Sequence, residues 1–323
     1  MTKTKQSPLQ NKTILVTGGT GSWGQAFVAE AIKHNPQAIR IFSRGEFLQS
    51  EMQKKFPDCT YLIGDVRDLE RLKLAFAGVD IVCHAAALKQ ILACEYSPDE
   101  AVKTNIQGSR NVVMAALDRG VEKVMALSTD KAAEPQTHYG KTKAAMESLV
   151  TQANSYRGKT FKTRFSCVRY GNVLGSRGSV VPLFKEQAKT GVLTVTHREM
   201  TRFWLTLQDG VLFVINCLST MEGGEIFVPK IASAKMLDLA KAIAPEAKCK
   251  FVGIRSSEKI HEVLLTVDES RHSRDMGSFF CIEPEHKFWK MKTDGNPLPE
   301  GFSYTSLNNP WQLSVEEIRS MLQ

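Results

Sequence analysis

The chain has 323 residues, of which 42% are hydrophobic and 24% are charged, as in a soluble globular protein with one large domain or two closely joined ones. No apolar run is long enough to cross a membrane, and the polar start MTKTKQSPLQNK lacks the apolar region of a signal peptide, so we expect a cytoplasmic protein. The seven cysteines form no CxxC pair and the seven histidines do not cluster, which argues against a disulfide framework and against a metal site.

The net charge of +8 favours anionic partners such as nucleotides and sugar phosphates. The basic residues are spread along the chain and form no block interleaved with aromatic residues. We therefore do not expect nucleic-acid binding.

The first half of the chain alternates short apolar strands with helices, which predicts an α/β fold with a doubly wound, parallel Rossmann sheet. Near-continuous apolar runs are required of strands that are covered on both faces. One crossover helix is expected at about residues 105–119. The expected strands cover residues 12–17, 38–44, 60–65, 80–86, 123–129 and 165–173.

After residue 174 the pattern becomes irregular, with a loop, a helix opened by Pro182 and a short strand in GVLTV. We expect a Rossmann domain over residues 1–174, to which the chain returns near residues 209–228. Residues 175–323 would mainly form a smaller, discontinuous substrate-binding domain.

The segment TGGTGSWG (17–24) follows the first expected strand and opens the first expected helix, in the pattern G-x-x-G-x-x-G. Glycines allow a tight turn and close approach to a pyrophosphate, and the helix N-terminus offers free N–H groups to the phosphates. Glycine-rich turns are common, but the strand before and the helix after favour a dinucleotide site. The predicted contacts are Gly18, Thr20, Gly21, Ser22, Trp23 and Gly24.

The second expected strand ends in Ser43 and Arg44, where an NAD site typically has an acidic residue. Arg44 can pair with a 2′-phosphate, which favours NADP, although the nearby Glu46 leaves NAD open. Asp65 and Val66, at the end of the third expected strand, would flank the adenine.

A serine or threonine at a strand end followed by Tyr-x-x-x-Lys is typical of short-chain dehydrogenases/reductases. Here Ser128 or Thr129 precedes Tyr139 and Lys143. The charge of the lysine is expected to lower the pKa of the tyrosine, so that the phenolate takes a hydroxyl proton as hydride leaves. The adjacent Asp130 and Lys131 would by themselves be interpreted equally well as a surface ion pair.

Longer strings show that the sequence resembles the inverting UDP-N-acetylglucosamine 4,6-dehydratases, a family of extended short-chain dehydrogenases/reductases. The resemblance covers about residues 11–311. It implies a lyase that uses NADP, takes UDP-N-acetylglucosamine as substrate, starts pseudaminic acid biosynthesis and assembles as a dimer or hexamer. The strings are STDKAAEPQTHYGKTK, TGGTGSWG, HAAALKQILACEYSP, KTNIQGSRNV, RYGNVLGSRGSVVP, MTRFWLTL, GGEIFVPK and GIRSSEKIHE.

The resemblance also implies residue roles. Tyr139 and Lys143 match the redox pair, Asp130 and Lys131 match the acid/base pair, and Thr129 matches a residue close to the sugar. Further cofactor contacts are implied for Ala85, Lys89 and Asn105. Contacts with the nucleotide sugar are implied for Lys89, Thr129, Asn172, Arg177, Val181, Thr196, Arg202, Arg255 and Glu258.

The two pairs belong to one reaction if oxidation at C4 makes the C5 proton acidic. In this hypothesis Tyr139 takes the C4 hydroxyl proton, a neutral Lys131 takes the C5 proton, and Asp130 donates to the departing C6 hydroxyl. A like charge on Lys143 would help to keep Lys131 neutral. Lysine at position 131, where retaining relatives carry glutamate, goes with inversion at C5 in the family.

Three alternatives stay open: a UDP-sugar 4-epimerase, a retaining 4,6-dehydratase, and a catalytically silent NADP-binding regulator. Departures from the family pattern at Gly45, Gln90, Ile91 and Ser256–Ser257 leave the fine sugar preference open.

Overall fold

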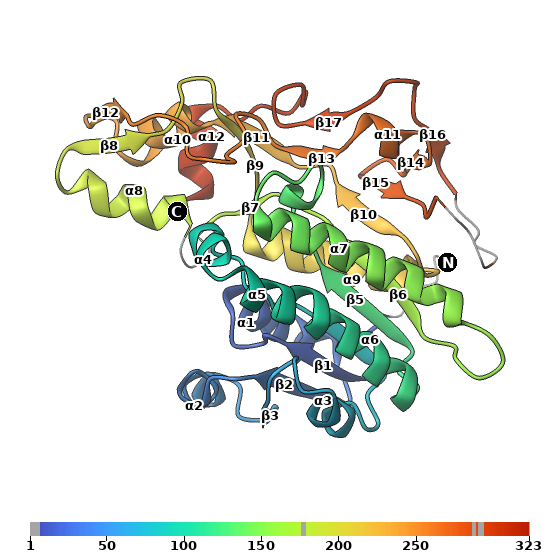
Figure 1. Ribbon diagram of the computed structural model, residues 1–323. Coiled ribbons are helices and arrows are strands. Elements are labelled where there is room, and N and C mark those ends of the chain that lie inside the picture. The colour runs from blue at the N-terminus through green and yellow to red at the C-terminus, as the bar shows by residue number, and fades with distance from the viewer. Residues whose placement is uncertain (1–6, 176–178, 286–288, 290–293, 323) are drawn as a thin grey trace, which may run out of the picture.

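In a computed structural model, which describes residues 7–175, 179–285, 289 and 294–322, one large twisted sheet runs through the molecule (Figure 1). The strand order is β16-β14-β15-β10-β6-β5-β4-β1-β2-β3. Its parallel part contains the Rossmann order 3-2-1-4-5-6, with β10 added beside β6. The predicted α/β fold class is confirmed.

The parallel strands are short and, except for the edge strand β3, largely buried, as their apolar sequences predict. The break after β6 differs from the expected single strand over 165–173, because β7 pairs with β9 in another sheet. The parallel strands are β1 (Thr13–Thr17), β2 (Ala38–Ser43), β3 (Thr60–Ile63), β4 (Ile81–His84), β5 (Lys123–Leu127), β6 (Arg164–Val168) and β10 (Ile226–Pro229).

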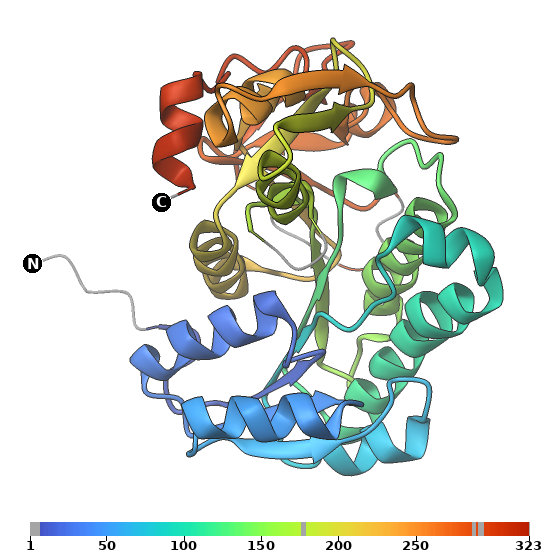
Figure 2. The same ribbon diagram turned by 90° about the vertical axis from the view of Figure 1, so that its left-hand side faces the viewer.

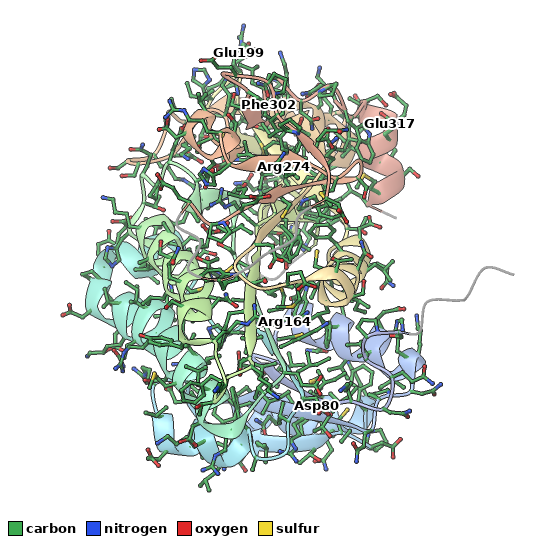
Figure 3. The ribbon with its side chains drawn as sticks, turned by 90° about the vertical axis from the view of Figure 1, so that its right-hand side faces the viewer. Asp80, Arg164, Glu199, Arg274, Phe302 and Glu317 are labelled. Atoms are coloured by element: carbon green, nitrogen blue, oxygen red, sulfur yellow. The ribbon has the colours of Figure 1, made fainter. Side chains whose placement is uncertain are left out.

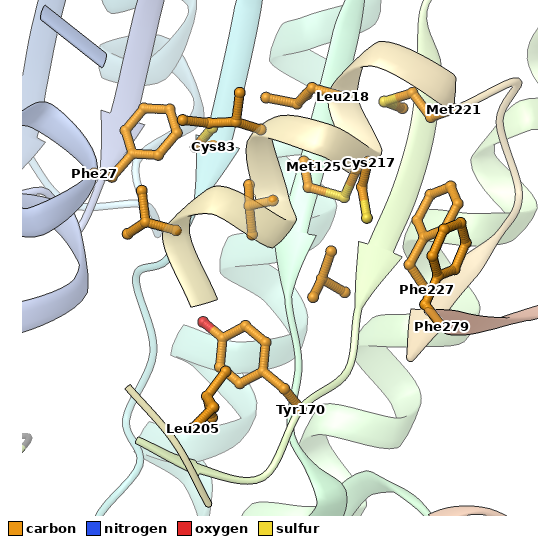
Figure 4. Packing of buried hydrophobic residues seen from close by; sticks show 14 of the residues in the cluster. Phe27, Cys83, Met125, Tyr170, Leu205, Cys217, Leu218, Met221, Phe227 and Phe279 are labelled. Carbon is orange, nitrogen blue, oxygen red and sulfur yellow. The ribbon is translucent and has the colours of Figure 1, made fainter. Parts of the chain in front are cut away.

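Helices cover both faces of this sheet. On one face α1 and α9 pack together, and Phe27, Cys217 and Leu218 belong to one buried cluster with Cys83 of β4 and Met125 of β5 (Figure 4). The opposite face carries α3, α6 and α7. The helices of this part are α1 (Ser22–Ala31), η1 (Ile32–His34), α2 (Glu46–Lys55), α3 (Leu69–Ala75), α4 (Ile91–Tyr96), α5 (Pro98–Ala101), η2 (Val102–Gln107), α6 (Gly108–Arg119), η3 (Asp130–Ala132), α7 (His138–Gln152), η4 (Ala153–Tyr156) and α9 (Leu207–Thr220).

The far edge of the sheet is built from the C-terminal part of the chain. β15 pairs antiparallel with β10, β14 with β15, and β16 with β14. These three strands, which were expected in the substrate-binding domain, therefore extend the main sheet beside β10. These strands are β14 (Ser273–Asp275), β15 (Phe279–Ile282) and β16 (Asn296–Pro297).

The smaller part of the molecule lies over the carboxyl ends of the parallel strands (Figures 1 and 2). In Figure 3, Glu199 and Glu317 mark its outer end, whereas Asp80 and Arg164 mark the opposite, amino edge of the sheet. Its core lies between α8, α10 and α12. Its elements are β7 (Asn172–Val173), α8 (Val180–Ala188), β8 (Val192–Val195), β9 (Thr201–Leu205), β11 (Ala232–Lys235), α10 (Met236–Ile243), β12 (Lys248–Phe251), β13 (Val263–Leu265), α11 (Val267–Ser270), β17 (Tyr304–Thr305) and α12 (Val315–Met321).

Among the described residues, no helix is both long and apolar enough to span a membrane. The same part of the chain contains no cluster of histidine, cysteine and acidic side chains suited to a metal ion. All seven cysteines are free thiols, and only Cys249 is not fully buried.

Candidate active site

A cavity of about 750 Å³ opens at the carboxyl edge of the parallel strands, where open α/β sheets bind their ligands. A second hollow of about 500 Å³ lies at the amino edge, between residues 117–123 and 160–164, and contains none of the predicted site residues. The predicted residues that line the large cavity are Gly18, Thr20, Gly21, Ser22, Trp23, Gly24, Ser43, Arg44, Asp65, Val66, Ala85, Lys89, Thr129, Lys131, Tyr139, Lys143 and Asn172.

The glycine loop has the backbone geometry that requires glycine. Gly18 has φ of +66°, and a Cβ at that position would lie 2.8 Å from the backbone nitrogen of Ala86. A Cβ on Gly24 would lie 2.3 Å from the carbonyl oxygen of Gly19, so the first turn of α1 packs directly on the loop. The loop therefore leads the helix N-terminus into the cavity, where its N–H groups can hold phosphate.

The end of β2 presents a cation to the same cavity. The side chain of Arg44 is 58% exposed, and its Nη1 lies 3.9 Å from Asp65 Oδ2. Arg67 holds the same carboxylate at 2.7 Å. Glu46 is exposed at the start of α2 and does not line the cavity. At the end of β2 the cavity is thus lined by arginine rather than by an acidic residue.

Helix α7 carries the Tyr-x-x-x-Lys motif, and its N-cap Thr137 accepts a hydrogen bond from the Gly140 N–H at 3.0 Å. Lys143 Nζ donates to the Leu127 carbonyl at 2.6 Å, at the end of β5. Burial lowers the pKa of Lys143 to about 8. Burial raises the pKa of Tyr139 to about 12, and Lys131 gives the largest opposing effect. The expectation that Lys143 gives Tyr139 a low pKa is therefore wrong, because burial is the largest influence on the phenol.

The acid/base pair lies against the same helix. A Cβ on Gly140 would lie 2.2 Å from the carbonyl oxygen of Lys131, so only glycine lets α7 and η3 pack this closely. Asp130 is fully buried. Its Oδ1 accepts from Lys131 Nζ and from Thr129 Oγ1, both at 2.9 Å. Lys131 Nζ also lies 3.4 Å from Asn172 Oδ1.

Of the two pKa values of this pair, that of Lys131 differs from our expectation. Burial lowers the pKa of Lys131, but Asp130 and Glu262 raise it more strongly, so the ammonium form is stabilised. The prediction that a neighbouring like charge keeps Lys131 neutral is therefore wrong, because two carboxylates surround it. Burial raises the pKa of Asp130, as an acid that donates a proton requires.

A run of charged side chains joins this pair to the smaller part of the molecule. Glu262 Oε1 lies 3.4 Å from Lys131 Nζ and 3.5 Å from Arg202 Nε. Arg202 Nη2 lies 3.6 Å from Glu258 Oε1. We call Asp130, Lys131, Glu262, Arg202 and Glu258 the charge chain. Arg202 and Glu258 do not line the cavity itself.

Asn105 lies on the π-helical turn η2 and is almost fully buried. Its amide nitrogen donates to the Leu88 carbonyl at 2.9 Å and to Thr142 Oγ1 at 3.0 Å, and its oxygen accepts from the Leu88 N–H at 2.8 Å. Asn105 therefore joins the segment beside Lys89 to α7. It acts behind the cavity wall and does not line the cavity.

Three predicted substrate residues also lie away from the cavity lining. Val181 is buried in the core of the smaller part, the Thr196 hydroxyl lies 3.2 Å from Met200 Sδ, and Arg255 is exposed. Ser179 and Val180 line the cavity on this side. Arg177 lies outside the described residues.

Sequence reasoning missed a buried hydrogen-bond chain beneath the site. Thr17 Oγ1 lies 2.7 Å from His84 Nδ1, and His84 Nε2 lies 3.0 Å from Ser109 Oγ. Ser109 Oγ donates to the Asn105 carbonyl at 2.6 Å, so it must accept from His84 Nε2–H, and Nδ1 accepts from Thr17. Burial, followed by the charge of Lys143, lowers the pKa of His84 to about 3. A neutral histidine thus links the end of β1, just before the glycine loop, to η2.

Several buried polar atoms around the cavity have no hydrogen-bond partner within the described part of the chain. They include Ser128 Oγ, Ser179 Oγ and Asp130 Oδ2. Buried polar groups in native proteins are usually paired. These atoms fit a polar ligand that reaches from the glycine loop to the acid/base pair.

A Rossmann sheet, a glycine loop after its first strand and a buried Tyr-x-x-x-Lys motif on the helix after its fifth strand define the short-chain dehydrogenase/reductase class. The additional part over the cavity is typical of its extended members.

Comparison with known proteins agrees with this class. Residues 14–284 match the model of a family described as polysaccharide biosynthesis protein. An inverting UDP-N-acetylglucosamine 4,6-dehydratase from Campylobacter jejuni is 45% identical over 96% of this chain and 97% of its own. A UDP-glucose 4-epimerase from Rickettsia canadensis is 38% identical over 97% of this chain and 95% of its own. The crystal structure of Pen from Bacillus thuringiensis is 35% identical, with a TM-score of 0.89 over 97% of this chain and 98% of that one.

The chain belongs to this polysaccharide biosynthesis family. The predicted resemblance to the inverting dehydratases is confirmed at the level of sequence.

Proposed function

We propose that the protein converts UDP-N-acetylglucosamine to the 4-keto-6-deoxy sugar, UDP-2-acetamido-2,6-dideoxy-L-arabino-hex-4-ulose, by dehydration across C5 and C6 with inversion at C5. The observation that carries the proposal is the packing of the Asp130–Lys131 pair, in which Asp130 is fully buried, against the helix of Tyr139 and Lys143. Simple alcohol oxidation needs only Tyr139 and Lys143. The 45% identical relative named for this activity supports the proposal.

The cofactor of this reaction is NADP, bound along the glycine loop. Bound there, it supplies reversible hydride transfer, from C4 of the sugar and back to C6, so that net redox is zero. Arg44 would pair with the 2′-phosphate, since its exposed guanidinium faces the cavity at the end of β2. Lys143, whose ammonium is within the cavity wall, would hold the ribose beside Tyr139.

Three side chains, Tyr139, Lys131 and Asp130, each carry out one proton transfer. Tyr139 accepts the C4 hydroxyl proton while the C4 hydride would leave to the cofactor, and the resulting ketone makes the C5 proton acidic. Lys131 takes the C5 proton, and Asp130 gives a proton to the C6 hydroxyl, which leaves as water. After reduction at C6, a proton returns to C5 from the opposite face.

The hydrogen bond between Lys131 and Asp130 explains how both groups reach the forms that the elimination needs. Asp130 and Glu262 raise the pKa of Lys131 and so favour its ammonium form. Transfer of one proton over the 2.9 Å contact to Asp130 yields a neutral amine and a neutral acid in one step. The raised pKa of Asp130 lowers the cost of that transfer, which the raised pKa of Lys131 opposes.

The alternative with independent support is UDP-sugar 4-epimerisation, because relatives at 37–39% identity are named UDP-glucose 4-epimerase. That reaction uses the tyrosine and lysine but not a second acid/base pair. Replacement of Lys131 by alanine separates the two. Dehydration should be abolished while NADP remains bound, whereas an epimerase should retain most of its activity.

The remaining features of the proposal follow from the reaction and from the resemblance. The enzyme is a carbon–oxygen lyase of the cytoplasm that acts in pseudaminic acid biosynthesis as a homo-oligomer, a dimer or a hexamer. Sedimentation of the purified chain tests the assembly, and the product of the reaction tests the pathway step.

A further inference from the structure

A third carboxylate faces the acid/base pair. Glu262 precedes β13, in the C-terminal half of the chain, and its side chain is 4% exposed. Its Oε1 lies 3.4 Å from Lys131 Nζ and 3.5 Å from Arg202 Nε, so one oxygen lies between two cations. Neither the Tyr-x-x-x-Lys motif nor the Asp130–Lys131 pair predicts this residue.

The backbone fixes the position of Glu262. Its N–H donates to Ser306 Oγ at 2.9 Å, and the Ser306 N–H donates to the Glu262 carbonyl at 2.8 Å. Ser306 Oγ also lies 2.7 Å from Thr201 Oγ1 on β9. These bonds hold the carboxylate against η3 before any ligand binds.

The charges around Glu262 come from three segments. Lys131 and Asp130 face it from η3, Arg202 from β9, and Lys259 and Glu258 from the preceding turn. Lys259 Nζ is held by the Ala133 carbonyl at 2.6 Å. Two carboxylates therefore flank the Lys131 ammonium, and Arg202 balances the charge of the second.

We propose that Glu262 is a positioning residue of the acid/base centre, which holds the Lys131 ammonium against Asp130 and keeps one proton on that pair. The expected effect of Glu262 on the reaction rests on the proposed function. Its expected effect on the protonation of Lys131 does not. Lys131 and Asp130 exchange the proton, and Glu262 itself does not contact the substrate.

The direction of the pKa values supports this role. Glu262 raises the pKa of both Lys131 and Asp130, although burial is the largest influence on each. Burial raises the pKa of Glu262, but Lys131 and Arg202 outweigh it, so the carboxylate stays charged. Loss of that charge should release the shared proton at lower pH.

The test uses Glu262→Gln, which keeps the size of the side chain and removes its charge. Lysine labelled with ¹³C at Cε reports the titration of Lys131, whose signal is assigned by its loss in Lys131→Arg. We expect the Lys131 titration to fall by about one pH unit or more in Glu262→Gln. We also expect kcat to fall by about 10-fold or more with KM for the sugar within about 3-fold.

Two further variants complete the design. Glu225→Gln is the matched control, because Glu225 is equally buried but binds Ser166, Glu222 and Gly223 at the amino edge of the sheet. It should leave the Lys131 titration and kcat unchanged. Glu262→Asp keeps the charge on a shorter stem and should restore part of both values. If Glu262→Gln does not fold, Glu262→Asp carries the test with a smaller shift in the same direction.

An unchanged Lys131 titration in the folded Glu262 variants overturns the inference, whatever the activity. If the wild-type chain makes no dehydrated product but the titration shifts as expected, the proposed function fails and the role of Glu262 on the pair stands.

Discussion

The first prediction concerns the buried His84, which should stay neutral in the folded chain and make the stability of the protein depend on pH. Its pKa is lowered from 6.5 to about 3, first by burial and then by Lys143. Protonation therefore favours the unfolded chain. The resulting loss of stability is absent well above pH 6.5, grows by about 1.4 kcal/mol per pH unit below it, and stops growing below about pH 3.

Between pH 7 and pH 5 this linkage amounts to about 2 kcal/mol of unfolding free energy. His84→Gln removes the titrating ring and keeps a donor and an acceptor between Thr17 and Ser109. Urea titrations of both proteins at the two pH values give the difference directly. The wild type should lose about 2 kcal/mol more than the variant on going to pH 5.

If both proteins lose the same unfolding free energy between pH 7 and pH 5, His84 is not a buried, neutral histidine. Nitrogen NMR of the histidine ring provides an independent check. The ring should be protonated at Nε2 alone down to pH 5, because Ser109 already uses its own hydrogen on the Asn105 carbonyl.

Three further predictions concern the reaction, the cofactor and the fold. Lys131→Ala should lower dehydration by at least about 100-fold, while fluorescence titration finds NADP bound as tightly as before. Arg44→Ala should weaken NADP binding by about 10- to 100-fold and NAD binding by less than about 3-fold, which calorimetry measures; equal losses would contradict the 2′-phosphate contact. Arg169→Met should lower the free energy of unfolding by about 3–5 kcal/mol, because Glu147 and Glu269, each held by two hydrogen bonds from Arg169, lose their partner; a loss below about 1 kcal/mol in urea titrations would contradict that reasoning.

Local sequence patterns predicted most of the Rossmann half. The apolar runs gave β1, β2 and β5 to within two residues at each end, since strands buried on both faces must be apolar throughout. Pairing between distant segments was harder to predict. The run FFCI at 279–282 is apolar, but nothing in it shows that β15 pairs with β10.

The same limit applies to the site. The glycine loop, the ends of β2 and β5, and Tyr139 and Lys143 line one cavity, as the position of parallel strand ends requires. Glu262 and His84 escaped prediction because their partners are distant in sequence, and a single buried carboxylate or imidazole has no spacing pattern. The protonation of Lys131 was predicted wrongly because Glu262, which is distant in sequence, faces the ammonium in the fold together with the adjacent Asp130.

The proton NMR spectrum of the product from UDP-N-acetylglucosamine in D₂O tests the proposed dehydration most directly. Elimination through Asp130 and Lys131 predicts a C6 methyl signal, loss of the C4 proton, deuterium at C5 and the L-arabino configuration. A product that keeps its C6 hydroxyl and changes configuration only at C4 would contradict the dehydration and leave epimerisation as the function of this site.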